Sequence, residues 1–112
     1  MGCVFCDIVK GSISVKKIYE NDDVLAFFDS SPQAPVHFLV IFKQHIESVA
    51  KLSSSQFKLV SEAFAAIVEV AKQLNLHEDF RIVNNCGSNS GQTISHVHFH
   101  VLSGRKFSWP PG

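Results

Sequence analysis

Residues 96 to 102 read His96-Val97-His98-Phe99-His100-Val101-Leu102. Successive side chains of a β-strand point to opposite faces of the sheet, so this alternation predicts a strand with three imidazoles on one face and apolar residues on the other. The apolar face is expected to pack on the core. A solvated strand with a polar outer face is the alternative, but three histidines beside a glycine-containing polar loop favour a functional site.

The three histidines of this strand are not spaced to share one metal ion. Alternate residues on a strand lie about 6.6 Å apart and the outer pair about 13 Å apart, whereas Zn–N bonds are about 2.0–2.1 Å long. Two neighbouring imidazoles could bind one ion, but His96 and His100 together could hardly do so. We therefore expect the three rings to have separate roles.

The rest of the chain predicts one long helix, a short N-terminal helix and four more strands. A capping-box pattern, Ser53 with Gln56, begins the long helix over residues 53–75. Its apolar residues recur at steps of three and four and are expected to face a sheet: Phe57, Val60, Phe64, Ile67, Val68, Ala71 and Leu74. The short helix is expected over residues 5–10, closed by Gly11, and strands over residues 15–20, 24–29, 37–42, 80–85 and 93–102. Because βαβ alternation is missing, we predict an α+β fold with a mainly antiparallel five-stranded sheet, in a single domain over residues 1–112.

Composition argues against several classes of protein. The 112 residues are 46% hydrophobic and carry ten Lys and Arg against ten Asp and Glu. This is typical of a globular domain without the long-range field that gathers nucleic acid or anionic membranes. The longest apolar run is Phe38–Phe42, whereas a membrane-spanning helix needs about 20 residues. Three cysteines, an odd number, argue against a disulfide framework. We expect a cytoplasmic or nuclear protein that binds neither nucleic acid nor membranes.

The three histidines and several other motifs resemble the histidine triad (HIT) superfamily. Residues 96–102 fit its signature His-φ-His-φ-His-φ-φ, where φ is an apolar residue. Further segments are similar to the Hint branch of that superfamily: Asp29–Pro35, His37–Val40, Asn85, Gly91–Thr93 and Trp109–Gly112. The resemblance implies a homodimer with a continuous sheet, which cleaves the P–N bond of purine nucleoside 5′-phosphoramidates and releases AMP or GMP and an amine. The alternatives are a dinucleoside polyphosphate hydrolase, a nucleotidyl transferase, or a nucleotide-sensing or scaffold module with incidental turnover.

The same resemblance assigns the catalytic residues. His98 is the expected nucleophile, because an unprotonated imidazole can attack phosphorus and form a nucleotidyl-histidine that water then cleaves. His100 is expected to hold the tautomer of His98 and to contact phosphate. His37 is expected to help relay a proton to the leaving group. We expect catalysis by these residues to require no cofactor.

The nucleotide-binding residues follow from the resemblance together with their chemistry. The segment Gly91-Gln92-Thr93 offers unobstructed N–H groups, an amide and a hydroxyl to phosphoryl oxygens, and Asn85 adds another amide. Asp29 is expected to accept hydrogen bonds from the ribose, although it could instead cap the turn that follows it. The base is expected to lie against apolar residues that could equally belong to the core: Val4, Phe5, Ile8 and Phe27. Ser30 is expected beside them, and Trp109 is expected to reach the partner's site.

A structural zinc site is expected at the N-terminus. Cys3-Val4-Phe5-Cys6 supplies a C-x-x-C pair, which is half of a tetrahedral site. The resemblance supplies the other two ligands, His45 and His96. The alternative is a pair of packed cysteines beside a surface histidine. Cys86 is expected to be an unpaired loop thiol.

Overall fold

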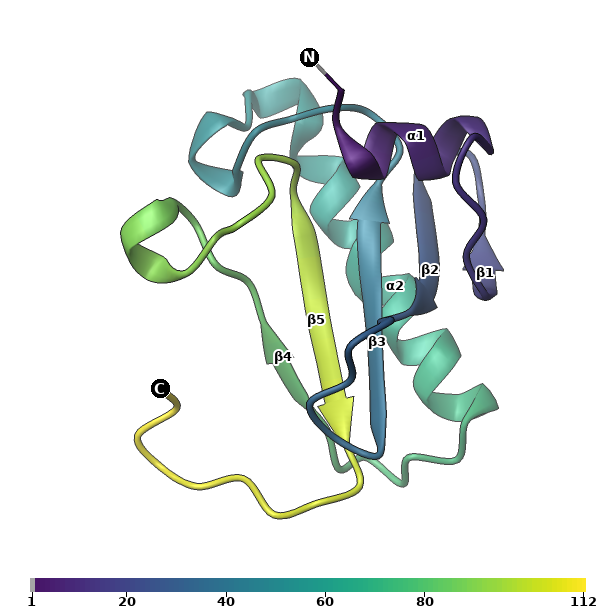
Figure 1. Ribbon diagram of the computed structural model, residues 1–112, viewed down its shortest axis with the longest axis vertical. Coiled ribbons are helices and arrows are strands. Elements are labelled where there is room, and N and C mark those ends of the chain that lie inside the picture. The colour runs from purple at the N-terminus through teal and green to yellow at the C-terminus, as the bar shows by residue number, and fades with distance from the viewer. Residues whose placement is uncertain (1) are drawn as a thin grey trace.

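The computed structural model describes residues 2–112. Within them, five antiparallel strands form one sheet in the order β1-β2-β3-β5-β4, and two α-helices accompany it (Figure 1). The elements in chain order are α1 (Val4–Lys10), β1 (Lys17–Glu20), β2 (Val24–Phe28), β3 (Val36–Phe42), α2 (Phe57–Gln73), β4 (Arg81–Val83) and β5 (His98–Ser103). The predicted α+β class, with a long helix and a short N-terminal helix, is confirmed.

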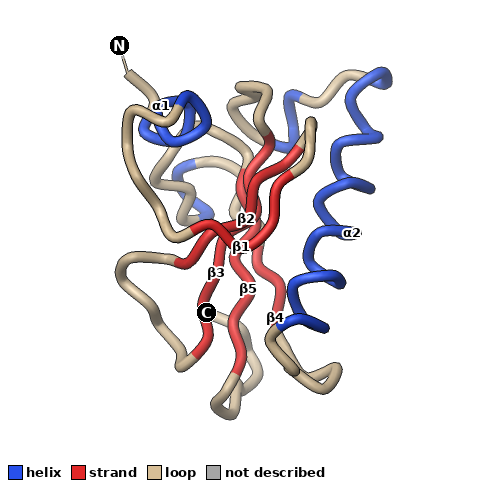
Figure 2. Tube along the Cα trace, turned by 90° about the vertical axis from the view of Figure 1, so that its right-hand side faces the viewer, coloured by secondary structure: helices blue, strands red, loops and turns tan. Residues whose placement is uncertain are grey.

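The two helices cover opposite faces of the sheet (Figure 2). On the α2 side, Val40 of β3 and Val101 of β5 are fully buried in the larger core cluster. On the α1 side, Phe5 and Ile8 pack with apolar residues of β2 and β3 in a second, smaller cluster. Both faces of the central strands are therefore buried, which explains why β2 and the Phe38–Phe42 part of β3 are continuous apolar runs rather than alternating ones.

The strand that carries the histidines begins at His98, so the prediction that it starts at residue 93 was wrong. The pairing of β3 with β5 ends where Ile41 faces His98, and beyond that point Val97 donates its N–H to the Ile46 carbonyl at 2.8 Å. His96 and Val97 thus lie outside the strand. The Phe5 ring still contacts the imidazoles of His96 and His98, with centroids 5.7 and 5.0 Å away, so both rings remain on the α1 side of the sheet.

The buried face of α2 also differs from the predicted one. A 3₁₀ turn over Ser54–Gln56 precedes the α-helix, and Ser53 donates its N–H to Gln56 Oε1 at 2.9 Å. Several predicted core residues are in fact accessible, with exposed fractions of 57% for Phe57, 42% for Phe64 and 48% for Val68. The residues that face the sheet are smaller on average: Leu59, Ala63, Ala66, Ile67, Val70 and Ala71. Because phenylalanines of the sheet fill the interface, small residues let the helix approach closely.

None of the helices within residues 2–112 has both the length and the apolar character needed to cross a bilayer.

Two glycines with positive φ offer a matched test of this packing. Gly104, directly after β5, has φ +97°, and a Cβ added there would lie 2.8 Å from Pro35 Cβ, whereas a Cβ on Gly11 (φ +86°) would meet nothing within 4 Å. Gly11→Ala should therefore cost only the left-handed backbone energy, about 1–2 kcal/mol. Gly104→Ala should cost about 1–3 kcal/mol more, because the loop after β2 must shift. Urea unfolding measures both, and equal losses would contradict the packing.

Candidate functional site

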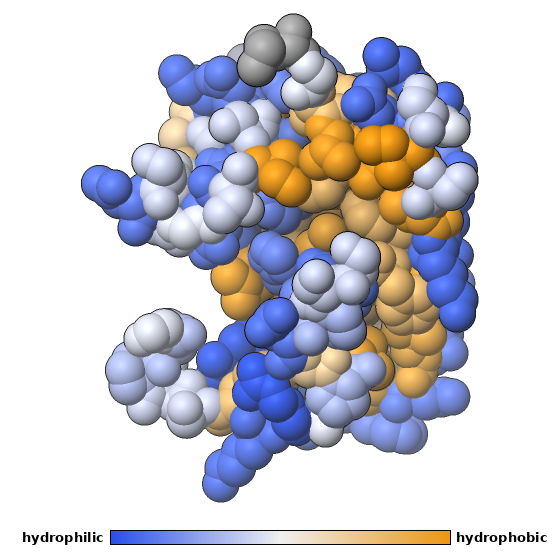
Figure 3. Space-filling view, viewed as in Figure 1, coloured by the Kyte–Doolittle hydropathy of each residue, from blue (hydrophilic) through white to orange (hydrophobic). Residues whose placement is uncertain are grey.

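A cavity of about 450 Å³ lies between α1, the end of β2 and the segment before β5. Hydrophobic side chains gather around α1 on the same face of the molecule (Figure 3). The structure brings these predicted site residues into its lining: Val4, Phe5, Ile8, Phe27, Asp29, Ser30, Thr93, His98 and His100. It adds residues that the sequence did not single out: Ile13, Ser14, Val15, Phe28, Leu39 and Ile94. The only sequence pattern at Ile13 and Val15 is their alternation with Ser14 after Gly11. That pattern is equally typical of an ordinary strand.

His98 presents an unprotonated nitrogen to this cavity. Its side chain is 5% exposed, and its Nδ1 lies 2.7 Å from the main-chain carbonyl oxygen of His96. A carbonyl only accepts hydrogen bonds, so Nδ1 carries the proton and Nε2 keeps its lone pair. The backbone of His96 therefore fixes the tautomer of His98, a task that the resemblance gave to His100.

His37 and His100 form a second hydrogen-bonded unit beside His98. The N–H of Gln33 donates to His37 Nδ1 at 3.0 Å, so the proton of neutral His37 lies on Nε2. That Nε2 lies 2.9 Å from His100 Nδ1 and 3.5 Å from Asp29 Oδ2. If His37 donates to His100, the proton of neutral His100 must lie on its Nε2. The rings of His98 and His100 are in contact, with centroids 5.1 Å apart.

Burial keeps this pair neutral near pH 7. Desolvation lowers the pKa of His37, and the nearby carboxylate of Asp29 opposes that shift without overcoming it. Desolvation also lowers the pKa of His100, and the neighbouring imidazoles of His98 and His37 lower it further. Neutral rings are the forms that the alternating donors and acceptors of this network require.

Several predicted phosphate ligands use their side chains to bond main-chain groups of the loop before β5 and of the segment after β3. Gln92 accepts a hydrogen bond from the Gly87 N–H at 2.8 Å and donates to the carbonyls of Glu47 and Ile94 at 2.7 and 3.0 Å. Asn85 donates to the Gly91 carbonyl at 3.4 Å. Of the predicted loop residues, the cavity lining includes Thr93 but not Asn85, Gly91 or Gln92. The side chains of Asn85 and Gln92 therefore stabilise the conformation of this loop.

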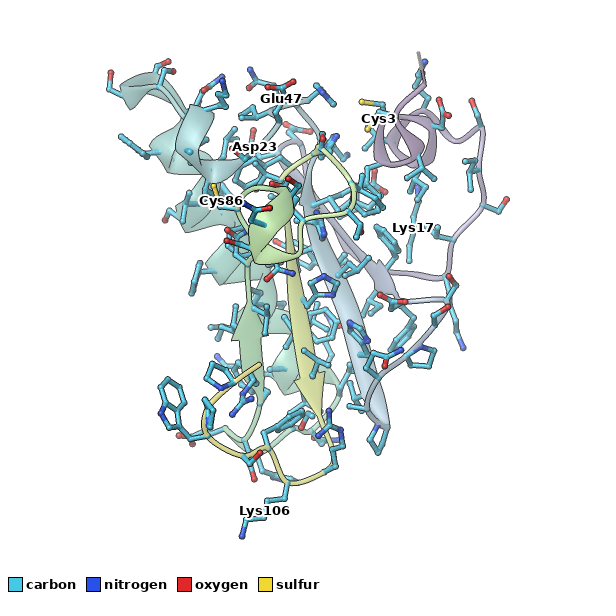
Figure 4. The ribbon with its side chains drawn as sticks, turned by 60° about the vertical axis from the view of Figure 1, so that its left-hand side comes forward. Cys3, Lys17, Asp23, Glu47, Cys86 and Lys106 are labelled. Atoms are coloured by element: carbon cyan, nitrogen blue, oxygen red, sulfur yellow. The ribbon has the colours of Figure 1, made fainter. Side chains whose placement is uncertain are left out.

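The predicted metal ligands meet at the N-terminal end of α1. One ligand atom from each of Cys3, Cys6, His45 and His96 lies within 4.8 Å of the others. His96 Nε2 lies 2.6 Å from the Phe42 carbonyl and so carries the proton, which leaves Nδ1 free to bind an ion. Burial lowers the pKa of His96, which favours that neutral ligand form. Cys86 lies well away from Cys3, on the loop after β4 (Figure 4).

The spacing of these four atoms fits a tetrahedral zinc site. Two nitrogens on one zinc lie about 3.3–3.4 Å apart, and a nitrogen and a sulfur about 3.5–3.6 Å apart, as follows from the bond lengths. His45 Nδ1 and His96 Nδ1 are 3.1 Å apart. The S–N distances are 3.4 Å from Cys3 to His96, 3.3 Å from Cys6 to His45 and 3.6 Å from Cys6 to His96. The residues present could therefore hold zinc with little movement.

Comparison with known proteins identifies the family. The HIT domain family matches residues 10–107. The chain belongs to the HIT family. An uncharacterized HIT-like protein of Synechocystis is 40% identical to it over 109 residues, which are 97% of this chain and 96% of that protein. The crystal structure of a HIT family hydrolase from Legionella pneumophila has a TM-score of 0.95 and 37% identity, covering 99% of this chain and 100% of the other. A histidine triad nucleotide-binding protein from Candida albicans has a TM-score of 0.84 and 27% identity, covering 99% and 85%.

The match to the HIT family covers the histidine residues but not the whole candidate site. Cys3, Cys6 and the cavity residue Phe5 precede the matched range, and Trp109 follows it. Trp109 is 84% exposed and does not line the cavity of its own chain. Two of the four candidate metal ligands, part of the apolar cavity wall and Trp109 therefore lie outside the residues that the HIT domain match covers.

The lowered histidine pKa values predict a pH dependence of folding. The unfolded chain takes up protons at the ordinary histidine pKa of about 6.5, whereas buried His37 and His100 resist protonation. Stability is therefore complete above that pH and declines as the pH falls through it. Between about pH 7.5 and about pH 5.5, His100→Gln should lose less unfolding free energy than the wild type.

Chemical denaturation at several pH values measures these slopes. His77→Gln, at an exposed position, is the matched control for the loss of one histidine. A His100→Gln slope as steep as that of the wild type would contradict the assignment.

Proposed function

We propose that this HIT protein is a nucleotide-binding hydrolase of the Hint type, a purine nucleoside phosphoramidase that works through a nucleotidyl-histidine. The supporting observation is the orientation of His98, whose unprotonated Nε2 belongs to a ring that lines an apolar-walled cavity with a carboxylate, Asp29, in the same lining. A nucleophilic nitrogen, an apolar surface for a base and an acceptor for ribose hydroxyls are the groups that a nucleoside 5′-phosphoryl substrate requires.

In the first step, His98 Nε2 attacks phosphorus. The Nε2–P bond forms while the P–N bond to the amine breaks, and the amine leaves with a proton from the site. In the second step water attacks the same phosphorus, the Nε2–P bond breaks, and AMP or GMP is released. The His96 carbonyl supports both steps, because it stabilises the positive charge that His98 carries as the intermediate forms.

His100 and His37 supply the proton donors in this proposal. His100 Nε2–H is the donor available to a phosphoryl oxygen. To protonate the departing amine, the His37–His100 pair must first take up one extra proton, which the nearby Asp29 carboxylate favours, and the water that attacks in the second step returns a proton to the pair. Asp29 then has two tasks. One oxygen accepts the Ser31 N–H at 2.7 Å, and the other lies near His37 and the cavity, where ribose hydroxyls could reach it.

Parallel assays with adenosine 5′-phosphoramidate and a diadenosine polyphosphate test the function. Wild type should release AMP from the phosphoramidate faster, and acid-free mass spectrometry should trap the nucleotidylated chain. His98→Asn should lower turnover about 10³-fold or more and abolish the adduct, because the nucleophile is gone, while AMP still binds. His77→Asn, at an exposed position, is the control.

The outcomes separate the candidate functions. Faster cleavage of the polyphosphate would replace the phosphoramidase with a dinucleoside polyphosphate hydrolase. Tight AMP binding without turnover would indicate a nucleotide-sensing module. Full activity of His98→Asn would end the proposal.

We also propose that Cys3, Cys6, His45 and His96 bind structural zinc. The ion would tether α1, and with it the Phe5 wall of the cavity, to the segment before His98. Without a cation the cluster is unfavourable for thiolates, since burial and the neighbouring Cys3 raise the pKa of Cys6. Cys3 and Cys6 form no disulfide bond in the structure, so both thiols are available to an ion.

Elemental analysis of protein prepared without chelator tests the metal site. Wild type and Cys86→Ser should contain about one zinc ion per chain. Cys6→Ser should contain almost none, because a tetrahedral site loses most of its affinity for zinc when one thiolate ligand is removed. Stoichiometric zinc in Cys6→Ser would show that the ion binds elsewhere.

We further propose that two copies of the chain pair along β4 into a continuous sheet. The outer side of β4 has no strand partner within residues 2–112. The molecule is indented along this side, between the loop after β4 and the C-terminal segment (Figure 3). Val68 of α2 lines a neighbouring hollow together with Phe80, which directly precedes β4, so an apolar surface continues from the strand onto the helix. An unpaired edge flanked by exposed apolar residues fits a second copy of itself.

The C-terminal segment lies on the same side. Arg81 of β4 donates to the Ser108 carbonyl at 3.0 Å, and Arg81 and Arg105 both stack on the Phe107 ring. These contacts hold the segment beside the edge strand. Trp109 would therefore lie next to the partner in such a pair.

Analytical ultracentrifugation tests the pairing. Wild type should sediment with twice the mass of the chain, and Val68→Glu should raise the dimer dissociation constant at least about a hundredfold, because it buries an unpaired charge. Lys51→Glu, at an exposed position on the 3₁₀ turn after β3, should leave it unchanged. A monomeric wild type would contradict the proposal.

A further inference from the structure

Asn84 forms a contact with the nucleophile's strand that the motifs do not predict. It directly follows β4, its side chain is part-buried, and its amide Nδ2 donates to the main-chain carbonyl of His98 at 2.9 Å. Asn84 does not line the cavity beside His98.

This contact lies just beyond the point where the pairing of β4 with β5 ends. β4 pairs with β5 from Arg81, which faces Leu102, to Val83, which faces His100. If the same register continued, residue 85 would face His98, but β4 ends at Val83 and the main chain turns into the loop. On its other side β5 remains paired with β3 as far as His98, which faces Ile41. The side-chain amide of Asn84 thus replaces the main-chain partner that His98 lacks on the β4 side.

The main chain at this point determines how the His98 ring is held. The ring donates through Nδ1 to the carbonyl of His96, so its orientation depends on the torsions of the two residues between that carbonyl and its own. His96 and Val97 lie outside the regular strand, and the Asn84 contact fixes the carbonyl at the other end of this short segment. A nucleophile displaced by about 1 Å can lose about a hundredfold in rate.

We infer that Asn84 is a positioning residue for His98: its amide fixes the main chain of the nucleophile so that Nε2 is aligned for attack. The inference rests on the proposed function, since it concerns the step in which the Nε2–P bond forms. Asn84 acts through the backbone of His98 and contacts neither base, ribose nor phosphate. Its loss should slow the chemical step and leave nucleotide affinity unchanged.

Single-turnover kinetics with adenosine 5′-phosphoramidate test the inference. Asn84→Leu keeps the size of the side chain and removes the amide, and Asn84→Asp replaces the donor with an oxygen facing a carbonyl. Both should slow formation of the nucleotidylated chain about tenfold to a hundredfold, while the dissociation constant for AMP changes less than about twofold. Asn84→Gln, which keeps an amide on a longer stem, should recover part of the rate. Asn89→Leu, at an exposed position in the same loop, is the matched control.

Three outcomes would overturn the inference, and the measurements distinguish them. Wild-type rates in Asn84→Leu and Asn84→Asp would overturn the inference and leave the proposed function intact. A parallel loss of AMP affinity and rate, with a lowered unfolding midpoint, would also overturn it, since that describes a purely structural residue. A wild-type protein that forms no adduct would overturn both proposals.

Discussion

The hydrogen bond from His98 Nδ1 to the main-chain carbonyl of His96 is the interaction on which the candidate site depends. Carbonyls of a regular strand point sideways to neighbouring strands, whereas side chains stand perpendicular to the sheet, so a ring does not normally reach the carbonyl two residues before it. The contact is possible because β5 begins only at His98. The late start of β5 therefore determines the tautomer of His98, its first residue.

The short helix α1 links two sites. Cys3 accepts the N–H of Cys6 at its start, and both thiols belong to the metal-capable cluster, while Phe5 between them contacts the rings of His96 and His98. Val4, Thr93 and Ile94 line both the cavity beside His98 and a second cavity over that cluster. A helix of seven residues is not stable alone, so it is held by its apolar packing and by what binds its cysteines.

Short-range patterns predicted the parts of this structure that local chemistry determines. The alternation around His98 placed the imidazoles, and the order of elements gave the α+β class. Periodicity did not select the buried face of α2, because that helix has two apolar faces and only the bulk of the sheet opposite decides between them. Side-chain contacts to distant backbone carry no local pattern. The amides of Gln92 and Asn84, which bond to main-chain carbonyls, could therefore not be assigned from the sequence.

The most direct test of the role of the His98–His96 hydrogen bond is the position of the proton on the His98 ring in the nucleotide-free protein. Nitrogen-15 NMR of imidazole-labelled protein near neutral pH distinguishes the two neutral tautomers, and comparison with His98→Asn assigns the signals. We predict one dominant form, with the proton on Nδ1 and the lone pair on Nε2. A ring with its proton on Nε2, or one exchanging freely between both forms, would show that the backbone does not prepare His98 to attack phosphorus.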